Sequence, residues 1–419
     1  MNEVPTTNPY SDFSTDKNFS SREKIFLITI IFLLSALCYF YMFRTYMFDT
    51  SVSYQDLFVQ REFCAYTLNG FDAYEYRGLE KAAAPGLGLI PSGFHATPWG
   101  SLLGNLFYPG YLTYEQSKIY FFIVSILILI LVSCMLYSEA KNISVTPPKL
   151  SDVVFMLSIT SVDFLVSVHM GNAGFAICAL LIISCLLCDK NPYIAGITLG
   201  IAMIKPQSAL LFCLAFLITK KFIPLIIAAV IDFAAWLGTS ILVNKGMFEL
   251  LREFFISPEH SEMPNAGLFS LFFENQYYSL VLSMILGIVF MLTLLKMLPK
   301  KLPNYFRLFP VCIASSFWCY SYVYDKYIHI IPAIVCIYIV MNSNKIIEKF
   351  SFLIFALFCM YSSIIRSVLR KVLAMFFNVP IDNYNIVSTQ LPNTLYEVIF
   401  IFLGILVAIK LRRIYKEAI

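Results

Sequence analysis

Charged side chains are scarce in this chain of 419 residues. Asp, Glu, Lys and Arg make up only 13% of it, whereas apolar residues make up 59% and the mean hydropathy is +0.75. Soluble domains carry about 25% charged residues, so this balance excludes an ordinary soluble protein and predicts a polytopic membrane protein. The net charge of +4 does not indicate a nucleic-acid partner, because the lysines and arginines lie in short segments between apolar runs, where they act as topology signals.

Metal-binding and disulfide patterns are also largely lacking. The eleven cysteines lie mostly singly within apolar runs, and the four histidines do not cluster. We therefore expect thiols within the membrane core rather than a disulfide framework or a metal centre. The chain has no Asp-x-Asp pair, so we expect no metal and no other cofactor.

Long apolar runs, by contrast, are abundant. The first run, residues 25–47, is too long for the core of a signal peptide and is not followed by a small-residue cleavage site, so we interpret it as a retained span after a polar tail, residues 1–24. A span needs about 20 apolar residues, fewer where a helix is broken. About twelve candidate spans follow: 25–47, 117–137, 152–168, 173–188, 192–204, 207–219, 222–243, 278–297, 308–322, 327–341, 350–369 and 394–410.

The distribution of positive charge predicts the orientation of these spans. With the first tail in the cytoplasm, most basic loops fall on the cytoplasmic side, as the positive-inside rule requires. These loops contain Lys141, Lys149, Lys190, Lys220, Lys221, Lys296, Lys300, Lys301, Arg307, Lys345 and Lys349, and the tail 411–419 adds more. The exception is the group Arg366, Arg370 and Lys371, which this assignment places outside.

Two long segments are then extracytoplasmic, residues 48–116 and 244–277, within a single membrane domain that covers residues 25–410. Loops of this length are usually functional. The apolar spacing within residues 54–70 predicts an amphipathic helix that lies on the bilayer and ends at Gly70.

Polar residues collect at four places on this outer side. They are Asp56, the Lys205–Gln207 stretch, the "YSYVYDKYIHIIP" segment at 320–332, and the turn that holds His169 and Asn172. A shared outer cavity would bring them together. A carboxylate can act as general base on a hydroxyl, a lysine can stabilise a phosphate as charge develops on it, and tyrosines offer flat faces and donors to a sugar. This inventory suits sugar transfer from a lipid phosphate, and also suits a transporter.

Four stretches resemble the GT-C class of polyprenyl-phosphate-sugar-dependent glycosyltransferases, and within it glycosyltransferase family 87. Residues 171–221, with the "GN" turn, two apolar spans and "KPQ", are similar to that family's Gly-Gln turn and Lys-Pro-Gln. Residues 55–74 resemble its aspartate, helix and Gly-x-Asp-Pro-Tyr, and residues 95–121 resemble the proline-containing run before its second span. The "YSYVYDKYIHIIPAI" segment at 320–334 looks like its late Tyr-Asp motif.

The resemblance implies an all-α GT-C-type bundle and a role for each motif residue. It implies that Asp56 is the catalytic base. The residues implied to bind the donor phosphate are Lys205, Gln207 and Lys326, and those implied to bind the substrates are Arg61, Asp72, His95, Asn172, Tyr324 and Asp325. The implied donor is a polyprenyl-phosphate sugar, mannose first, and the implied acceptor is a glycan or glycolipid. The implied location is the bacterial inner membrane, with an extracytoplasmic active site and inversion at the sugar.

Plainer interpretations stay open for the same residues. Asp56 could be a solvated loop acid, Lys205 could extend to the membrane interface, and Asp325 with Lys326 could form an interfacial ion pair. Two other functions also stay open. A transporter or flippase for lipid-linked sugars predicts an inverted repeat and charges through the whole membrane depth, whereas an O-antigen-type polymerase or ligase predicts arginines in a large outer loop.

Overall fold

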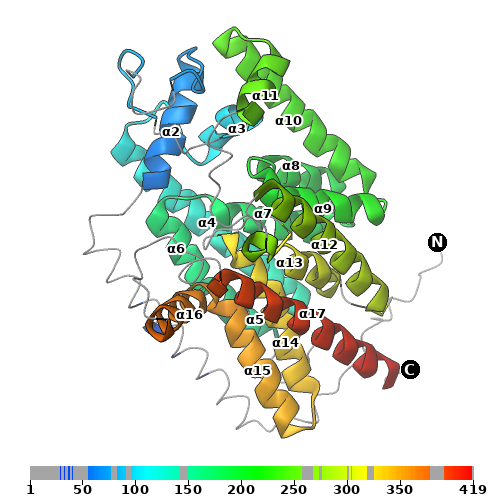
Figure 1. The fold of residues 1–419 in the computed structure, drawn as a ribbon. Helices are drawn as coiled ribbons and strands as arrows, with labels where there is room; N and C mark the ends of the chain where they lie inside the picture. The colour runs from blue at the N-terminus through cyan, green and yellow to red at the C-terminus, as the bar shows by residue number, and fades with distance from the viewer. Residues whose placement is uncertain are drawn as a thin grey trace, which may run out of the picture.

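The computed structural model describes residues 55–76, 83–90, 96–141, 150–256, 268–272, 276–299, 302, 304–318, 325–377 and 391–417, together with positions 29, 33, 36, 37 and 40. The predicted span at 25–47 therefore lies almost wholly outside the described residues, as do His95 and Tyr324. Helices dominate the described part of the chain (Figure 1). This confirms an all-α polytopic protein, and the count of twelve spans stays a prediction.

Five helical stretches in the described part are long and apolar enough to cross a membrane. They are α4 (Tyr114–Lys141), α5 (Leu150–Ile159) continued by α6 (Val162–Met170), α10 (Phe222–Val243), α12 (Gln276–Met297) and α17 (Leu391–Glu417). On α4, Ile119, Ile123 and Leu127 are exposed at a four-residue spacing, whereas Phe121, Ser125 and Leu129 are buried. One stripe of this helix therefore suits lipid and the other packs on the bundle.

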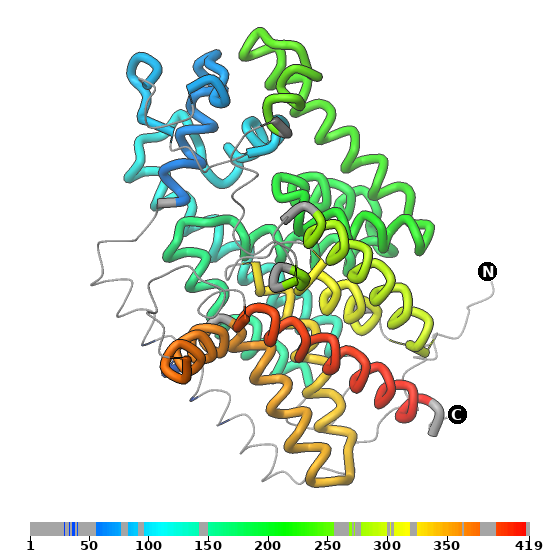
Figure 2. The backbone as a smooth tube through the Cα atoms, viewed as in Figure 1, coloured from blue at the N-terminus to red at the C-terminus, as the bar shows by residue number. Residues whose placement is uncertain are grey.

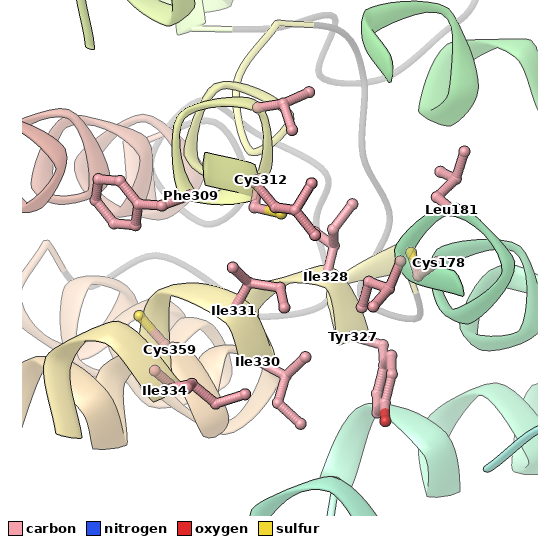
Figure 3. Close-up of a cluster of buried hydrophobic side chains, with 14 of the residues drawn as sticks. Cys178, Leu181, Phe309, Cys312, Tyr327, Ile328, Ile330, Ile331, Ile334 and Cys359 are labelled. Carbon is pink, nitrogen blue, oxygen red and sulfur yellow. The ribbon is translucent and has the colours of Figure 1, made fainter. Parts of the chain in front are cut away.

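Shorter apolar helices fill the centre of the bundle: α7 (Gly174–Leu187), α8 (Pro192–Ala202), α9 (Pro206–Ile218), α13 (Phe309–Ala314) and α14 (Ile330–Asn342). Every residue from 174 to 186 on α7 and from 330 to 341 on α14 is buried, as expected of helices that are apolar on all sides. The turn η8 (Tyr327–His329) leads into α14, and Figure 3 shows Tyr327 and Ile328 beside Cys178 of α7. The site is built at the ends of these central helices.

The described part of residues 48–116, the segment that the charge pattern predicts to be extracytoplasmic, helps to form a cap at one end of the molecule, here called the outer cap. There α2 (Gln55–Leu68) packs against α3 (Pro98–Leu103), close to α11 (Met247–Ile256), while α14 and α15 (Ile346–Met360) reach the opposite end (Figure 1). The helix predicted at 54–70 is present and is followed by Gly70 at φ +78°. The prediction that this helix is amphipathic is wrong, because the residues from Phe63 to Thr67 are all buried. Neighbouring elements of the protein surround this part of the helix, so it does not lie with one face on the bilayer.

The span predicted at 350–369 is broken. Helix α15 ends at Met360, and α16 (Ser362–Phe376) leaves it at 92°. The sharp change of direction can be followed along the tube in Figure 2. Tyr361 lies between them with a non-helical backbone (φ −111°, ψ 30°). Along α16, exposed Val368, Val372 and Met375 form one stripe, with Arg366 and Arg370 on another, so this helix is amphipathic.

One glycine allows α2 to approach the turn between α6 and α7. Gly171 ends α6 in the left-handed region, at φ +66°. A Cβ atom there would lie 2.5 Å from the Cβ atom of Leu57, which is the residue next to Asp56. A side chain at position 171 would therefore meet both backbone strain and a collision.

We predict that Gly171→Ala lowers the free energy of unfolding by about 1–3 kcal/mol, the usual effect of overpacking, and displaces the start of α2. Gly246→Ala is the matched control, because its new Cβ atom would have no neighbour closer than 3.8 Å. Thermal unfolding in detergent measures both variants. Equal melting temperatures for the two would contradict the prediction.

Candidate functional site

A hydrogen-bonded chain of four side chains lies where the central helices end. Asn172 donates from Nδ2 to Oδ2 of Asp56 over 2.8 Å, although 116 residues separate them in the sequence. The Oδ1 atom of Asn172 accepts from Lys205 Nζ (2.7 Å) and from the backbone N–H of Gly174 (2.9 Å). These contacts fix which way the Asn172 amide points.

The chain continues from Lys205 to Asp325. Lys205 Nζ lies 2.9 Å from Asp325 Oδ1, and the two side chains are 14% and 3% exposed. The backbone carbonyl of Asp325 also accepts from the Cys178 thiol of α7. A buried charge needs such a partner, so the ion pair accounts for a lysine placed between two apolar helices. We call Asp56, Asn172, Lys205 and Asp325 the polar chain.

Each member of the polar chain lies at a helix terminus or break. Asp56 is in the first turn of α2, and Asn172 is the middle residue of the three-residue turn between α6 and α7. Lys205 is the N-cap residue of α9, which begins at Pro206 after α8 has ended at Ala202. Proline fits the first position of a helix and disfavours helical geometry in the residue before it, so the sequence itself breaks the helix at Lys205. The amino ends of α7 and α9 therefore both face this site, and their dipoles favour negative charge there.

The surroundings of Asp56 favour a carboxyl group that can take up a proton. Burial raises the pKa of Asp56 above its usual range. The hydrogen bond from Asn172 and the charge of Lys205 lower the pKa in part, and the charge of Asp325 raises it again. The net result is a half-buried carboxylate with a raised pKa, which is a property of general bases.

Arg61 and Asp72 lie elsewhere in the outer cap. Arg61 donates from Nε (2.9 Å) and from its terminal nitrogen (2.7 Å) to the carbonyl oxygen of Leu112, and it pairs with Glu62. Its position braces α2 against the loop before α4. Asp72 pairs with Lys245 and accepts the N–H of Tyr74.

Lys245 is the centre of a second polar group in the outer cap. It contacts Asp72, Glu75 (2.8 Å) and Glu253 (2.7 Å). Burial by itself would lower the pKa of Lys245, but the hydrogen bonds to the three carboxylates outweigh this and raise it. One oxygen from each of the three carboxylates lies within 4.8 Å of the others, a spacing that could hold a metal ion, and the Lys245 ammonium bonds to all three.

The remaining predicted site residues are placed as follows. Gln207 is half-buried in the first turn of α9, and its carbonyl oxygen accepts from the Trp318 indole over 2.9 Å. Lys326 is 2% exposed and follows Asp325 directly. His95 and Tyr324 fall outside the described residues.

Sequence reasoning missed several contacts of the site. The Tyr108 hydroxyl accepts the backbone N–H of Ala173, so the loop before α4 also holds the Asn172 turn. No pattern around Tyr108 signals this contact.

The cysteines include one Cys-x-x-Cys spacing, Cys185 and Cys188, at the far end of α7, and both are free thiols.

The comparison with protein families gives a match. The model of glycosyltransferase family 87 matches residues 98–314, just over half of the chain. The matched segment contains Asn172, Lys205 and Gln207, whereas Asp56, Asp325 and Lys326 lie outside it. No curated protein and no solved structure matches the chain.

We predict that Lys205→Met lowers the free energy of unfolding by about 3–5 kcal/mol, because it leaves Asp325 buried without its cation. The double variant Lys205→Met with Asp325→Asn removes both charges and should recover part of this loss. Thermal unfolding of both variants in the same detergent measures the difference. A double variant less stable than the single one would show that the ion pair is not what holds this part of the fold.

Proposed function

The chain belongs to glycosyltransferase family 87 and is a membrane glycosyltransferase, and from this premise we propose that it transfers a sugar from a polyprenyl-phosphate donor to a hydroxyl group of a glycan or glycolipid. Mannose is the first sugar to test. We place the reaction on the extracytoplasmic face of a bacterial inner membrane. The distribution of basic residues supports this side of the membrane. The loops rich in lysine and arginine alternate along the sequence with the segments that hold the polar chain, so these segments fall on the side opposite to the cytoplasm.

The chemical step follows from the residue types of the site. Asp56 takes the proton from the acceptor hydroxyl, and the oxygen forms a bond to the anomeric carbon of the donor sugar. The bond between that carbon and the phosphate oxygen breaks, and polyprenyl phosphate leaves with the electron pair. Because one displacement occurs, the configuration at the anomeric carbon inverts.

The observation that carries this proposal is the contact between Asp56 and Asn172. Asn172 lies inside the segment that matches the family, whereas Asp56 lies outside it, and the 2.8 Å hydrogen bond joins them. An aspartate in a solvated loop would be hydrogen-bonded to water and not to the side-chain amide of a buried asparagine. The same amide is held by Lys205, so the orientation of the base depends on the ion pair behind it.

Lys205 and Lys326 supply positive charge for the donor phosphate in this proposal, and Gln207 lies beside Lys205. The amino ends of α7 and α9 add to the positive potential. In this proposal Asn172 and Asp325 contact the sugar, and the same role is proposed for Tyr324 and His95, which lie outside the described residues. For Arg61 and Asp72 we propose an indirect part in substrate binding, through the cap that they brace.

We predict that Asp56→Asn lowers the turnover number about 10²–10⁴-fold, because the amide keeps the shape of the carboxylate but cannot accept the proton. The measurement is transfer by purified protein in nanodiscs, with a panel of radiolabelled polyprenyl-phosphate sugars and a glycolipid extract. Glu115→Gln is the control, since it neutralises an acid that is 75% exposed near the start of α4. Full activity in Asp56→Asn would remove Asp56 as the base. Binding of a donor with no transfer by the wild type would favour a transporter.

We also predict a pH dependence set by Asp56. The base works only when ionised, and a raised pKa means that it takes up its proton at a higher pH than an ordinary aspartate. Activity should therefore fall as pH drops through this raised value. Asn172→Leu removes the hydrogen bond that lowers the pKa, so the acidic limb of kcat/KM should move to still higher pH. An unchanged limb, or one moved to lower pH, would contradict the role of Asn172.

A further inference from the structure

Two cationic side chains from distant parts of the sequence converge on one aromatic ring. Lys326 Nζ lies 5.9 Å from the centroid of the Tyr396 ring, and Arg366 Cζ lies 5.7 Å from the same centroid. Tyr396 is fully buried near the start of α17, and its hydroxyl lies 3.2 Å from His329 Nδ1. His329 is held in turn by Ser316, at 2.7 Å from Nε2. The ring is therefore held in place, and both cations lie within 6 Å of its centroid.

Lys326 has only weak neighbours for a buried ammonium. Its nearest polar contact in the described part of the chain is the carbonyl oxygen of Ser316, at 3.5 Å. Within that part, no carboxylate lies within 4.0 Å of Lys326 Nζ. The adjacent Asp325 points to Lys205 instead. A buried cation in this state calls for an anion.

Arg366 is likewise held by a neutral group. Its Nε donates to Oδ1 of Asn393 over 2.9 Å, and a terminal nitrogen donates to the same atom. One acid, Glu397, acts electrostatically on both cations, and its Oε2 atom is buried without a hydrogen bond among the described residues. Two cations thus lie together while the carboxylate beside them forms an ion pair with neither in the described structure.

The sequence gives an independent reason to examine Arg366. It belongs to the group of basic residues that violates the positive-inside rule. The break at Tyr361 turns α16 by 92° away from α15, and this turn brings Arg366 onto Tyr396 while Lys371 stays exposed. A charged side chain that is enclosed in a membrane bundle is by default a candidate functional residue.

We propose that Arg366 and Lys326 together form the binding site for the phosphate group of the lipid-linked donor, with α16 as the element that carries the second cation. This inference rests on the proposed function and adds Arg366 to it. A guanidinium can give two parallel hydrogen bonds to phosphate oxygens, and an ammonium adds a point charge. The sugar would then lie towards Asp325 and the polar chain, with Asp56 beyond it.

The test compares Arg366→Ala with Lys371→Ala, which removes a charge of the same sign from an exposed position on the same helix. We expect Arg366→Ala to raise the KM for the polyprenyl-phosphate sugar roughly tenfold or more, with the KM for the acceptor unchanged, because a charge-assisted hydrogen bond to the donor alone is lost. Arg366→Lys should give a smaller rise, since lysine keeps the charge but not the paired geometry. Lys371→Ala should match the wild type. A fall in kcat with an unchanged donor KM would overturn the proposal.

A binding measurement makes the test independent of transfer. A long-chain polyprenyl monophosphate should raise the melting temperature of the wild type and of Lys371→Ala, but not of Arg366→Ala, and should raise that of Arg366→Lys by less. The matching polyprenol, which lacks the phosphate, should have no such effect. No shift in the wild type, or equal shifts in all variants, would overturn the phosphate site. If the wild type shows the shift but transfers sugar from none of the donors, the proposed function fails while the phosphate site stands.

Discussion

The buried ion pair between Lys205 and Asp325 is the interaction on which the site depends. Lys205 lies at the break between the apolar helices α8 and α9, and an unpaired charge at such a place would strongly oppose folding in the membrane. Its partner comes from a segment 120 residues away, and the pair is completed by Asn172. Three separate breaks in the central helices must therefore meet for any one of them to be stable. This requirement also places Asp56, since Asn172 is the residue that binds it.

The same requirement explains why the central helices are short. Helices α7, α8 and α9 have 14, 11 and 13 residues, less than the roughly 20 needed to cross a bilayer. Their ends leave backbone N–H groups that a continuous span would have used internally. In lipid these groups would be unsatisfied, so broken helices are tolerated only where protein or a polar cavity surrounds them. The polar chain and the enclosed position of α7 meet this condition.

Much of this arrangement could be predicted from the sequence because it follows from local rules. Hydropathy located the long helices, Pro206 marked the break at Lys205, and the alternation of spans placed Asp56, Asn172, Lys205 and Asp325 at one end. The contacts that could not be predicted are those between residues that come together only in the folded chain. Arg61 binds a backbone carbonyl 51 residues away, and Lys245 takes Asp72 into a different group of charges. Hydropathy also missed the turn at Tyr361, since it does not distinguish a straight span from one broken at a single residue.

The distribution of charge between the two groups bears on how the reaction would run. The polar chain contains two carboxylates and one cation, whereas the group around Tyr396 contains two cations and one carboxylate, Glu397, which forms an ion pair with neither cation in the described structure. In the proposed displacement with inversion, Asp56 lies on the side of the attacking hydroxyl, whereas the cations Lys205, Lys326 and Arg366 lie on the side of the leaving phosphate. Asp325 and Lys326 are adjacent in sequence but belong to different groups, so this one peptide bond would mark the boundary between them. The backbone at this point, fixed by the contact between Cys178 and the Asp325 carbonyl, would thereby hold base and leaving group apart.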